Sequence, residues 1–336
     1  MAQHSYSGQT DMKQKIGNIL YKQGIFLVLA VLFVICSLLN PNFLSFTNLS
    51  NIARQLSVTT IVALGETILI ICGMIDLSAG SVIALSGVLS VAAFKATESL
   101  LVAIAVGITI GVICNMINAG MIANFKVPPF IATLAMQTMA RGVALLYTRG
   151  QNILRLGRFT LFGQGTIAGI PTPIIFMVCL FIVTWYILKH TRFGRSIYAI
   201  GGNQEAAAAS GINVNSVKYK AFFFHGVLVG IAGVLFMSRV NAGLPNGAIN
   251  YEFTALTAAI IGGTSFSGGI GTASGTLAGA FIVGFLDNIM NLTGVDSYIQ
   301  QIVRGAIIAL AVIYDIWAKG KRRTKSSLGD IERKAA

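Results

Sequence analysis

The sequence predicts an all-α polytopic membrane protein with about ten transmembrane helices and both termini in the cytoplasm. Of its 336 residues, 55% are hydrophobic and only 10% are charged, and the mean hydropathy is +0.77. A soluble domain carries about 25% charged residues, so this chain has too little polar surface to cover a globule in water. Apolar runs of bilayer-spanning length recur along the chain, which places it in a membrane.

The expected spans follow from the apolar runs and from the breaks between them. The first run resembles a signal-peptide core, but no small-residue cleavage pattern follows it, so we interpret it as an uncleaved helix. Short polar breaks separate the next runs, and the later ones are rich in glycine, which lets helix backbones approach closely in a membrane. The expected spans are 23–40, 57–74, 79–95, 99–123, 128–147, 172–189, 220–240, 253–268, 272–292 and 299–318.

Basic residues indicate which side of the membrane each end occupies. A basic cluster directly follows the last run, three lysines precede the first, and the loop 189–220 carries five more basic residues. The positive-inside rule assigns this side to the cytoplasm. The chain therefore divides into a cytoplasmic segment 1–22, a transmembrane domain 23–318 and a basic cytoplasmic tail 319–336. The net charge of +13 is not accompanied by an aromatic-rich basic groove, so nucleic acid is not expected as a partner.

The sequence predicts neither a metal site nor a catalytic site. The four cysteines lie within apolar runs, without paired or metal-ligand spacing, and the three histidines are isolated, so no histidine-based metal site is expected. They are Cys36, Cys72, Cys114, Cys179, His4, His190 and His225. No motif brings together a nucleophile, a base or a metal-ligand set, so the protein is not expected to be an enzyme.

A polar segment interrupts the apolar chain at 201–214, which reads GGNQEAAAASGINV. Asn203 is placed to cap a short helix that continues from Gln204 to Ser210, and Gly211 is placed to end it. Its small side chains let another surface come close, so we predict a rigid docking helix in the cytoplasm. The alternative is a helix lying on the membrane interface, although alanine methyl groups make a weak apolar face. The chain has no Gly-x-x-x-x-Gly-Lys-Ser/Thr phosphate loop, so ATP-driven transport would need an ATPase on another chain.

Five stretches of the sequence resemble the membrane permease subunit of bacterial ABC importers for monosaccharides, the ribose, galactose and xylose group. They are PNFLSFTNLSNIARQLSV (41–58), GMIDLSAGSVIALSG (73–87), VPPFIATLAMQTMARG (127–142), TRFGRSIYAIGGNQEAAAASGINV (191–214) and AAIIGGTSFSGGIGTASGTLAGAF (258–281). Together they extend over nearly the whole chain. The resemblance implies the fold of the vitamin B12-type importers, with residues 23–318 as a permease domain in the bacterial inner membrane.

The resemblance also implies partners. These are a second copy of this chain or a paralogous permease, two copies of a cytoplasmic ABC ATPase that binds ATP and Mg²⁺, and a periplasmic sugar-binding protein. Membrane lipid is a further partner, and no cofactor is expected in this chain itself. Permeases of the same fold for an autoinducer, a nucleoside or a branched-chain amino acid remain alternatives. An ion-driven secondary transporter is a weaker one, because Asp76 and Asp287 do not make a dense set of midplane acids.

The string EAAAASG matches the Glu-Ala-Ala-x-x-x-Gly core of the loop that docks on the ATPase in importers. The resemblance therefore implies that this loop passes motion from the ATPase to the spans. Arg192 and Arg195 are expected to pair either with acidic groups of the ATPase or with lipid phosphates, and both interpretations remain open. The expected ATPase-coupling residues are Arg192, Arg195, Gly201, Gly202, Asn203, Glu205, Ala206, Ala207 and Gly211.

Two stretches are candidates for the translocation path or its gate. Asp76 lies at a break between two apolar runs, where it either caps the next helix through the amides of Ser78 and Ala79 or lines the path, and the cap is favoured. The glycine-rich stretch 262–271 breaks a helix, either to offer hydroxyls and amides to a sugar or to pack two helices tightly. The candidates in it are Gly262, Gly263, Thr264, Ser265, Ser267, Gly268 and Gly269.

Asp287 and Asn291 are the last path candidates, and they share one face of a predicted helix because they are four residues apart. Polar stripes within spans hold neighbouring helices together by hydrogen bonds. Asn115 and Asn118 form a similar pair. For these stripes helix packing is therefore favoured over contact with a solute.

Overall fold

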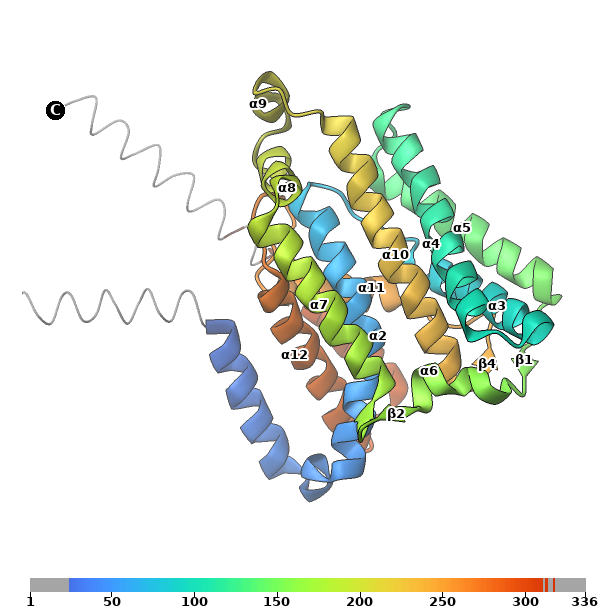
Figure 1. The fold of residues 1–336 in the computed structure, drawn as a ribbon. Helices are drawn as coiled ribbons and strands as arrows, with labels where there is room; N and C mark the ends of the chain where they lie inside the picture. Colours follow the sequence, from blue (N-terminus) through green and yellow to red (C-terminus); the bar gives the residue numbers. More distant parts are fainter. Residues whose placement is uncertain (1–23, 311, 314–316, 318–336) are drawn as a thin grey trace, which may run out of the picture.

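Figure 1 shows the fold of the computed structural model as a bundle of long helices. The structure describes residues 24–310, 312–313 and 317. The predicted cytoplasmic segment 1–22 and the basic tail 319–336 lie outside these residues. In the described part nearly all regular structure is helical, and strands are limited to four pieces of two residues. The prediction of a polytopic all-α membrane protein is confirmed.

Seven helices in the described part of the chain are long and apolar enough to cross a membrane. They are α2 (Phe46–Ile71), α3 (Ala79–Thr97), α4 (Leu100–Ala123), α5 (Pro129–Thr148), α7 (Thr172–His190), α10 (Val214–Val240) and α12 (Ala273–Leu292). Two shorter apolar helices are Gly24–Leu39 and α11 (Tyr251–Ile261). A last helix begins at residue 297 and continues through residue 310.

Short elements connect the long helices at the two ends of the bundle. At one end lie α8 (Arg192–Gly202) and α9 (Gln204–Ala209), and we call this the α9 end (Figure 1). The opposite end carries α6 (Leu161–Gln164) and two small antiparallel sheets. The remaining elements are η1 (Pro41–Leu44), η2 (Gly157–Thr160), β1 (Ile153–Leu154) paired with β4 (Ala242–Gly243), and β2 (Thr166–Ile167) paired with β3 (Ile170–Pro171).

The expected spans differ from the helices mainly at their ends. The span 253–268 is wrong in extent, because α11 stops at Ile261 and Gly263 turns the chain with a φ of 87°. Helix α2 begins eleven residues before the expected start, at Phe46, and α10 begins six residues early, at Val214. Both helices begin in polar sequence. A prediction based on apolar runs therefore placed the first residue of each helix too far toward the C-terminus.

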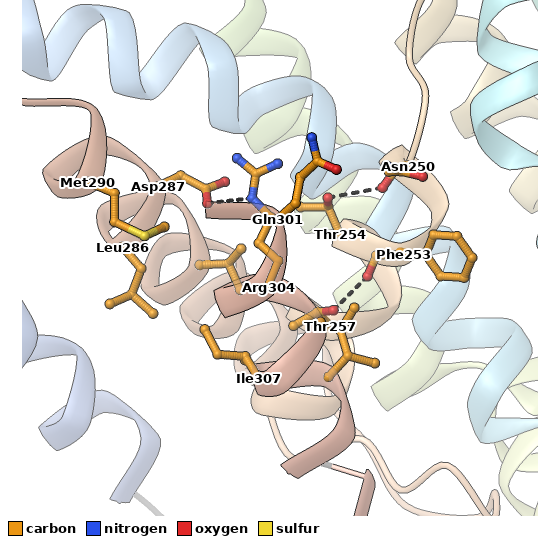
Figure 2. A pocket seen from close by; sticks show the side chains of 13 residues that line it. Asn250, Phe253, Thr254, Thr257, Leu286, Asp287, Met290, Gln301, Arg304 and Ile307 are labelled. Carbon is orange, nitrogen blue, oxygen red and sulfur yellow. Dashed lines mark hydrogen bonds and ion pairs between the residues drawn. The ribbon is translucent and has the colours of Figure 1, made fainter. Parts of the chain in front are cut away.

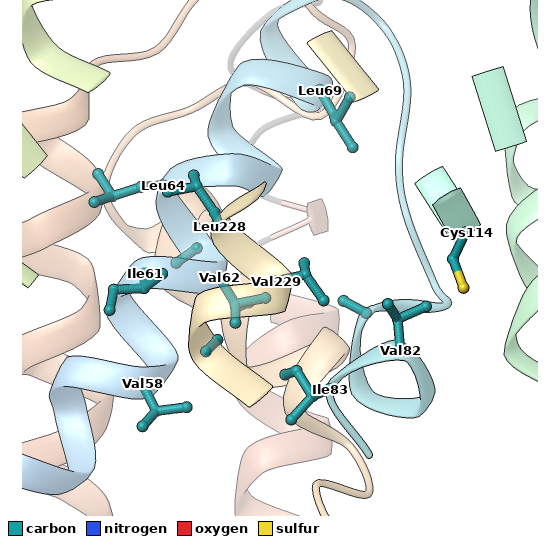
Figure 3. Packing of buried hydrophobic residues seen from close by; sticks show 14 of the residues in the cluster. Val58, Ile61, Val62, Leu64, Leu69, Val82, Ile83, Cys114, Leu228 and Val229 are labelled. Carbon is teal, nitrogen blue, oxygen red and sulfur yellow. The ribbon is translucent and has the colours of Figure 1, made fainter. Parts of the chain in front are cut away.

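The bundle is built around α2, α10 and α3. The most apolar windows of these helices are 89%, 78% and 72% buried, whereas those of α4, α5 and α7 are each 28% buried. Figure 3 shows side chains of α2 and α10, among them Val62, Leu64, Leu228 and Val229, in one buried cluster. The outer helices therefore keep a broad apolar surface for lipid or for other membrane helices, and the central helices supply the core.

Glycines let α4 and α10 approach each other closely. Gly107 and Gly111 of α4 face Gly226 and Gly230 of α10. A Cβ on Gly230 would lie 2.6 Å from the carbonyl oxygen of Gly107, and a Cβ on Gly226 would lie 2.7 Å from that of Gly111. In each helix the two glycines are four residues apart, which is the small-xxx-small contact that packs membrane helices.

Substituting Gly230 with leucine is expected to force α4 and α10 apart. The new side chain has no space between the two backbones, and overpacking of this kind costs about 1–3 kcal/mol or more. The matched control is Gly142→Leu on α5, where nothing lies within 4 Å of an added Cβ. Thermal unfolding of the two variants in detergent measures the difference, and equal midpoints would contradict the close contact.

Candidate functional site

The residues predicted to dock on a partner lie at the α9 end. Asn203 caps α9, because its side-chain oxygen accepts a hydrogen bond from the Ala206 amide at 3.0 Å. Gly211 turns the chain with a φ of 85°, which side chains with a Cβ rarely adopt. The predicted helix, its cap and its stop are confirmed, although α9 ends at Ala209 rather than at Ser210.

Helix α9 presents a mostly exposed surface. Ala207 is 4% exposed and packs inward, whereas Glu205 and Ala206 are exposed. Arg192 and Arg195 of α8 are also exposed. The α9 end therefore offers one carboxylate, two guanidinium groups and a strip of methyl groups to a partner.

An open hollow of about 570 Å³ lies beside α9. Residues of α9, of the turn between α4 and α5 and of the first turns of α10 line it, among them Glu205, Lys126 and Lys218. Cys72, Gly73 and Met74, which follow α2, close one side. The hollow thus reaches from the exposed helix to the end of the most buried helix of the bundle.

The backbone of α8 packs directly on the end of α2. A Cβ on Gly201 would overlap the carbonyl oxygen of Ile71, which accepts a hydrogen bond from the Gly269 amide at 2.8 Å. A Cβ on Gly268 would lie 2.9 Å from the carbonyl oxygen of Gly201, and one on Gly269 would lie 3.1 Å from Gly202. The glycines of α8 therefore pack on those of the stretch 262–271, although the two groups are far apart in the sequence.

Tyr198 of α8 strengthens this contact. Its hydroxyl donates a hydrogen bond to the carbonyl oxygen of Gly271 at 2.7 Å. Burial raises the pKa of Tyr198, so the phenol remains a protonated donor at neutral pH. Helix α8 is therefore fixed to the turn between α11 and α12 by a side-chain bond as well as by backbone packing.

The glycine-rich stretch 262–271 forms this turn. Gly262 packs on the first turn of α12, where a Cβ on Gly275 would overlap the Gly262 carbonyl oxygen. Thr264 and Ser265 are buried, at 1% and 4% exposure. Gly263, Ser267, Gly268 and Gly269 belong to the same turn. These contacts are the ones expected of a tight packing turn, the second of the two interpretations of this stretch.

The break at Asp76 lies inside the bundle. The segment 72–78 between α2 and α3 is not helical, and Asp76 is fully buried. One carboxylate oxygen of Asp76 accepts from the Ser78 amide at 2.6 Å and from the Ser78 hydroxyl at 2.5 Å. The expected bond from the Ser78 amide to Asp76 is present, but Ser78 is itself the N-cap residue of α3, and its side chain makes no capping hydrogen bond to this helix. Asn118 of α4 donates to the Ser78 hydroxyl at 3.1 Å.

Two ionisable side chains that the sequence interpretation missed surround Asp76. Oε2 of Glu66, from α2, accepts a hydrogen bond from the Asp76 amide at 3.3 Å. Nε2 of His225, from α10, lies 3.1 Å from the second oxygen of Asp76 and 3.7 Å from Oε1 of Glu66. We call Glu66, Asp76, Ser78, Asn118 and His225 the buried polar centre. The sequence interpretation of His225 as isolated is wrong, because in the folded chain His225 lies beside Asp76 and Glu66.

A second irregular segment, 241–250, enters the bundle before α11. Arg141 of α5 holds it by donating to the carbonyl oxygens of Pro245 and Gly247, at 2.7 Å each. Glu252, at 2% exposure, accepts a hydrogen bond from Gln137 at 3.1 Å. A Cβ on Gly80 of α3 would overlap Glu252, so the first turns of α3 and α11 meet. Non-helical backbone at membrane depth is tolerated only when it is buried in protein or lines a cavity.

Asp287 and Asn291 face the last helix. Asp287 accepts from the guanidinium of Arg304 at 2.8 Å, and Asn291 accepts from Gln300 at 3.0 Å. Figure 2 shows the Asp287–Arg304 pair at a pocket of about 200 Å³, which Thr254 and other residues of α11 also line. Both bonds join helices, as the favoured packing interpretation expects.

Ionisable residues inside apolar runs were the signal in the sequence for the rest of the buried polar centre around Asp76. Glu66 lies ten residues into the expected span 57–74, and ionisable residues within spans are rare and face the interior of the bundle. His225 carries the same signal in the span 220–240. The contact between them depends on the packing of α2 on α10, which no local pattern encodes.

Three features indicate a polytopic membrane transport subunit. Long apolar helices surround a buried polar centre, two helices begin inside the bundle, and an exposed capped helix lies at one end. Residues 48–312 match the family described as the permease component of the branched-chain amino acid transport system, and the chain belongs to this family. It is therefore a transport subunit and not an enzyme, and a multi-pass protein of the bacterial inner membrane.

Curated relatives align with nearly the whole chain. The ribose import permease protein RbsC of Haemophilus influenzae is 41% identical, over 92% of this chain and 97% of that protein. RbsC of Bacillus subtilis is 42% identical, over 91% and 97%. The L-arabinose transport system permease protein AraH of Escherichia coli K12 is 36% identical, over 95% and 98%. No solved structure matches this chain significantly.

Proposed function

We propose that this chain is the membrane permease subunit of an ATP-driven importer and forms the path for a monosaccharide. The observation that carries the proposal is the likeness to ribose and arabinose import permeases along nearly the full length of both sequences. These relatives favour a sugar over an autoinducer, a nucleoside or a branched-chain amino acid as the solute. A neutral sugar also requires no charged ligand site, because its hydroxyls bind to amides and hydroxyls.

The proposed assembly contains more than this chain. Two permease subunits, either two copies of this chain or one with a paralogue, enclose the path in the arrangement of the vitamin B12-type importers, with about ten spans each. A cytoplasmic ABC ATPase binds ATP and Mg²⁺, and a periplasmic binding protein delivers the sugar. We place the docking site of the binding protein at the end opposite α9, on the segment 149–169. That segment is tied to α10 by the Ser238 hydroxyl, which donates to the Phe159 carbonyl at 2.7 Å.

We assign the ATPase contact to the α9 end. The exposed face of α9 and the exposed Arg192 and Arg195 support this, with Asn203 and Gly211 fixing the helix ends and Gly202 at the exposed end of α8. A docking element passes on motion only if it is rigid and contacts the moving parts directly. The packing of Gly201 on Ile71 and on the turn 262–271 provides that contact. Arg192 and Arg195 pair with ATPase carboxylates or with lipid phosphates.

We assign the gate of the path to the meeting point of the two irregular segments. Asp76 and Ser78 in one segment and the segment 241–250 with Glu252 in the other lie where α3 and α11 begin. Movement of the segment 241–250 and α11 against Asp76 and Ser78 would open or close a passage without unwinding a long helix. The turn 262–271, with Thr264, Ser265 and Ser267, then transmits the motion of α8 to α11 and α12, and Asp287 and Asn291 hold the last helix during it.

Asn203→Ala is expected to lower uptake several-fold without removing the protein from the membrane. Losing the cap costs about 1 kcal/mol of helix stability. Helix α9 has only six residues, so few other helical hydrogen bonds compensate for this loss. Asn203→Asp keeps a capping oxygen and is expected to transport nearly as well as the wild type. Sugar uptake per permease in vesicles checks this, and equal rates for both variants would show that the cap is unimportant.

Gentle detergent purification from native membranes, followed by mass spectrometry of every co-purifying protein, tests the proposed function. We expect a P-loop ATPase that is retained by the wild type. If the chain purified without an ATPase and still transported solute under an ion gradient, an ATP-driven importer would be excluded.

A further inference from the structure

Three metal-ligand atoms converge in the buried polar centre. Glu66, Asp76 and His225 each offer one such atom within 4.8 Å of the other two, and all three side chains are fully buried. The paired atoms are Oε1 of Glu66, Oδ2 of Asp76 and Nε2 of His225. Each comes from a different part of the fold: α2, the segment 72–78 and α10. Among the residues that the structure describes, these three atoms have no hydrogen-bond partner.

The surrounding bonds leave one oxygen of each carboxylate free. Asp76 uses Oδ1 for the Ser78 amide and hydroxyl, and Glu66 uses Oε2 for the Asp76 amide. Asn118 donates to Ser78 and thereby fixes that hydroxyl. Hydrogen bonds of this kind, to the atom that does not bind the ion, orient the ligands of metal sites.

Both ring nitrogens of His225 lack a hydrogen-bond partner in the described part of the chain, although an imidazole ring offers a polar atom at each of them. The ring is held instead by packing, because Gly65 lies so close to Nδ1 that a Cβ there would overlap it. Nε2 lies 3.1 Å from Asp76 Oδ2, yet the two are not aligned for a hydrogen bond. Unpaired buried polar atoms of this kind point to an absent ion or water.

Charge and distance fit a divalent ion. Two ionised carboxylates in a dry interior are strongly unfavourable without a compensating cation, and one ion of charge +2 would neutralise both. Ligand atoms about 2 Å from one ion lie roughly 3–4 Å from each other, and the two measured separations are 3.1 and 3.7 Å. Imidazole with carboxylates selects a first-row transition metal such as Zn²⁺ rather than Mg²⁺ or Ca²⁺, which prefer oxygen ligands alone.

We propose that Glu66, Asp76 and His225 bind one divalent transition-metal ion, with Zn²⁺ as the best fit. The ion would join α2 and α10 to the segment 72–78, with water completing its coordination as the fourth ligand. The site is a property of this chain and does not depend on which solute it carries or on ATP. It fixes the non-helical segment where α3 begins.

The metal content of the purified full chain tests this directly. The protein carries a streptavidin-binding tag rather than a histidine tag and is washed with a weak chelator before elemental mass spectrometry. We expect about one zinc ion per chain in the wild type, the same in the His190→Ala control, and less than about a tenth of an ion in Glu66→Gln and His225→Gln. Wild type with less than about a tenth of an ion of any divalent metal would overturn the proposal.

A second measurement needs no variant. Stripping the wild type with a strong chelator is expected to lower its thermal unfolding midpoint by about 4 °C or more, and adding Zn²⁺, but not Mg²⁺, is expected to restore it. An unfolding midpoint that neither the chelator nor Zn²⁺ changes would show that protons or water alone hold the three side chains together.

Discussion

Glu205→Lys is expected to abolish sugar uptake while the protein stays folded in the membrane. Glu205 is exposed on α9 and contributes the only acidic side chain of its first turn, so reversing its charge disturbs a partner rather than the core. Gly211→Pro is expected to do the same by another route. Proline fixes φ near −65°, whereas Gly211 has a φ of 85°, and such a mismatch destabilises the turn by more than about 1 kcal/mol.

Retention of the ATPase during purification and uptake by vesicles measure both variants. Glu98→Lys is the matched control for retention, because it makes the same charge change at an exposed turn between α3 and α4. Helix α9 is at the other end of the bundle (Figure 1). Undiminished uptake by Glu205→Lys and Gly211→Pro would remove α9 from the coupling mechanism.

Arg141→Ala is expected to destabilise the bundle and to stop transport. Its guanidinium holds the irregular segment 241–250 through two carbonyl oxygens, those of Pro245 and Gly247. Hydrogen bonds to charged donors contribute about 1.5–3 kcal/mol each, and the freed carbonyls are in a part of the chain with little access to water. Thermal unfolding in detergent and vesicle uptake measure the effect.

Two further substitutions make the Arg141 result specific. Arg141→Lys keeps the charge but not the planar fork that reaches both carbonyls, so we expect a stability between those of the wild type and the alanine variant. Arg158→Ala removes an exposed arginine of η2 and is expected to leave the unfolding midpoint unchanged. A midpoint for Arg141→Ala equal to that of Arg158→Ala would contradict a pinning role for Arg141.

Local chemistry was sufficient to predict α9. A capping asparagine, a run of alanines and a glycine stop act within a few residues, so Asn203 and Gly211 could be placed from the sequence alone. The class of fold was likewise predictable, because it follows from composition. The starts of α2 and α10 were not, since these helices extend beyond the apolar runs into polar segments, where Ser45 and Asn213 cap them.

Contacts between distant segments were beyond the sequence interpretation. Gly201 and Gly269 were assigned to separate groups, one for coupling and one for the path, yet they meet at the end of α2. The same limit hid the buried polar centre. Glu66 and His225 are 159 residues apart in numbering, and only the packing of α2 on α10 brings them to Asp76.

The most direct test of the ATP-driven mechanism is sugar uptake by sealed vesicles that contain the purified permease and its co-purified ATPase. Labelled ribose and arabinose are supplied outside with the binding protein, and ATP is either enclosed in the ATPase compartment or omitted. We expect uptake of one of these sugars only with ATP and Mg²⁺, and none with Glu205→Lys. Uptake that needs no ATP and follows an ion gradient would contradict the mechanism.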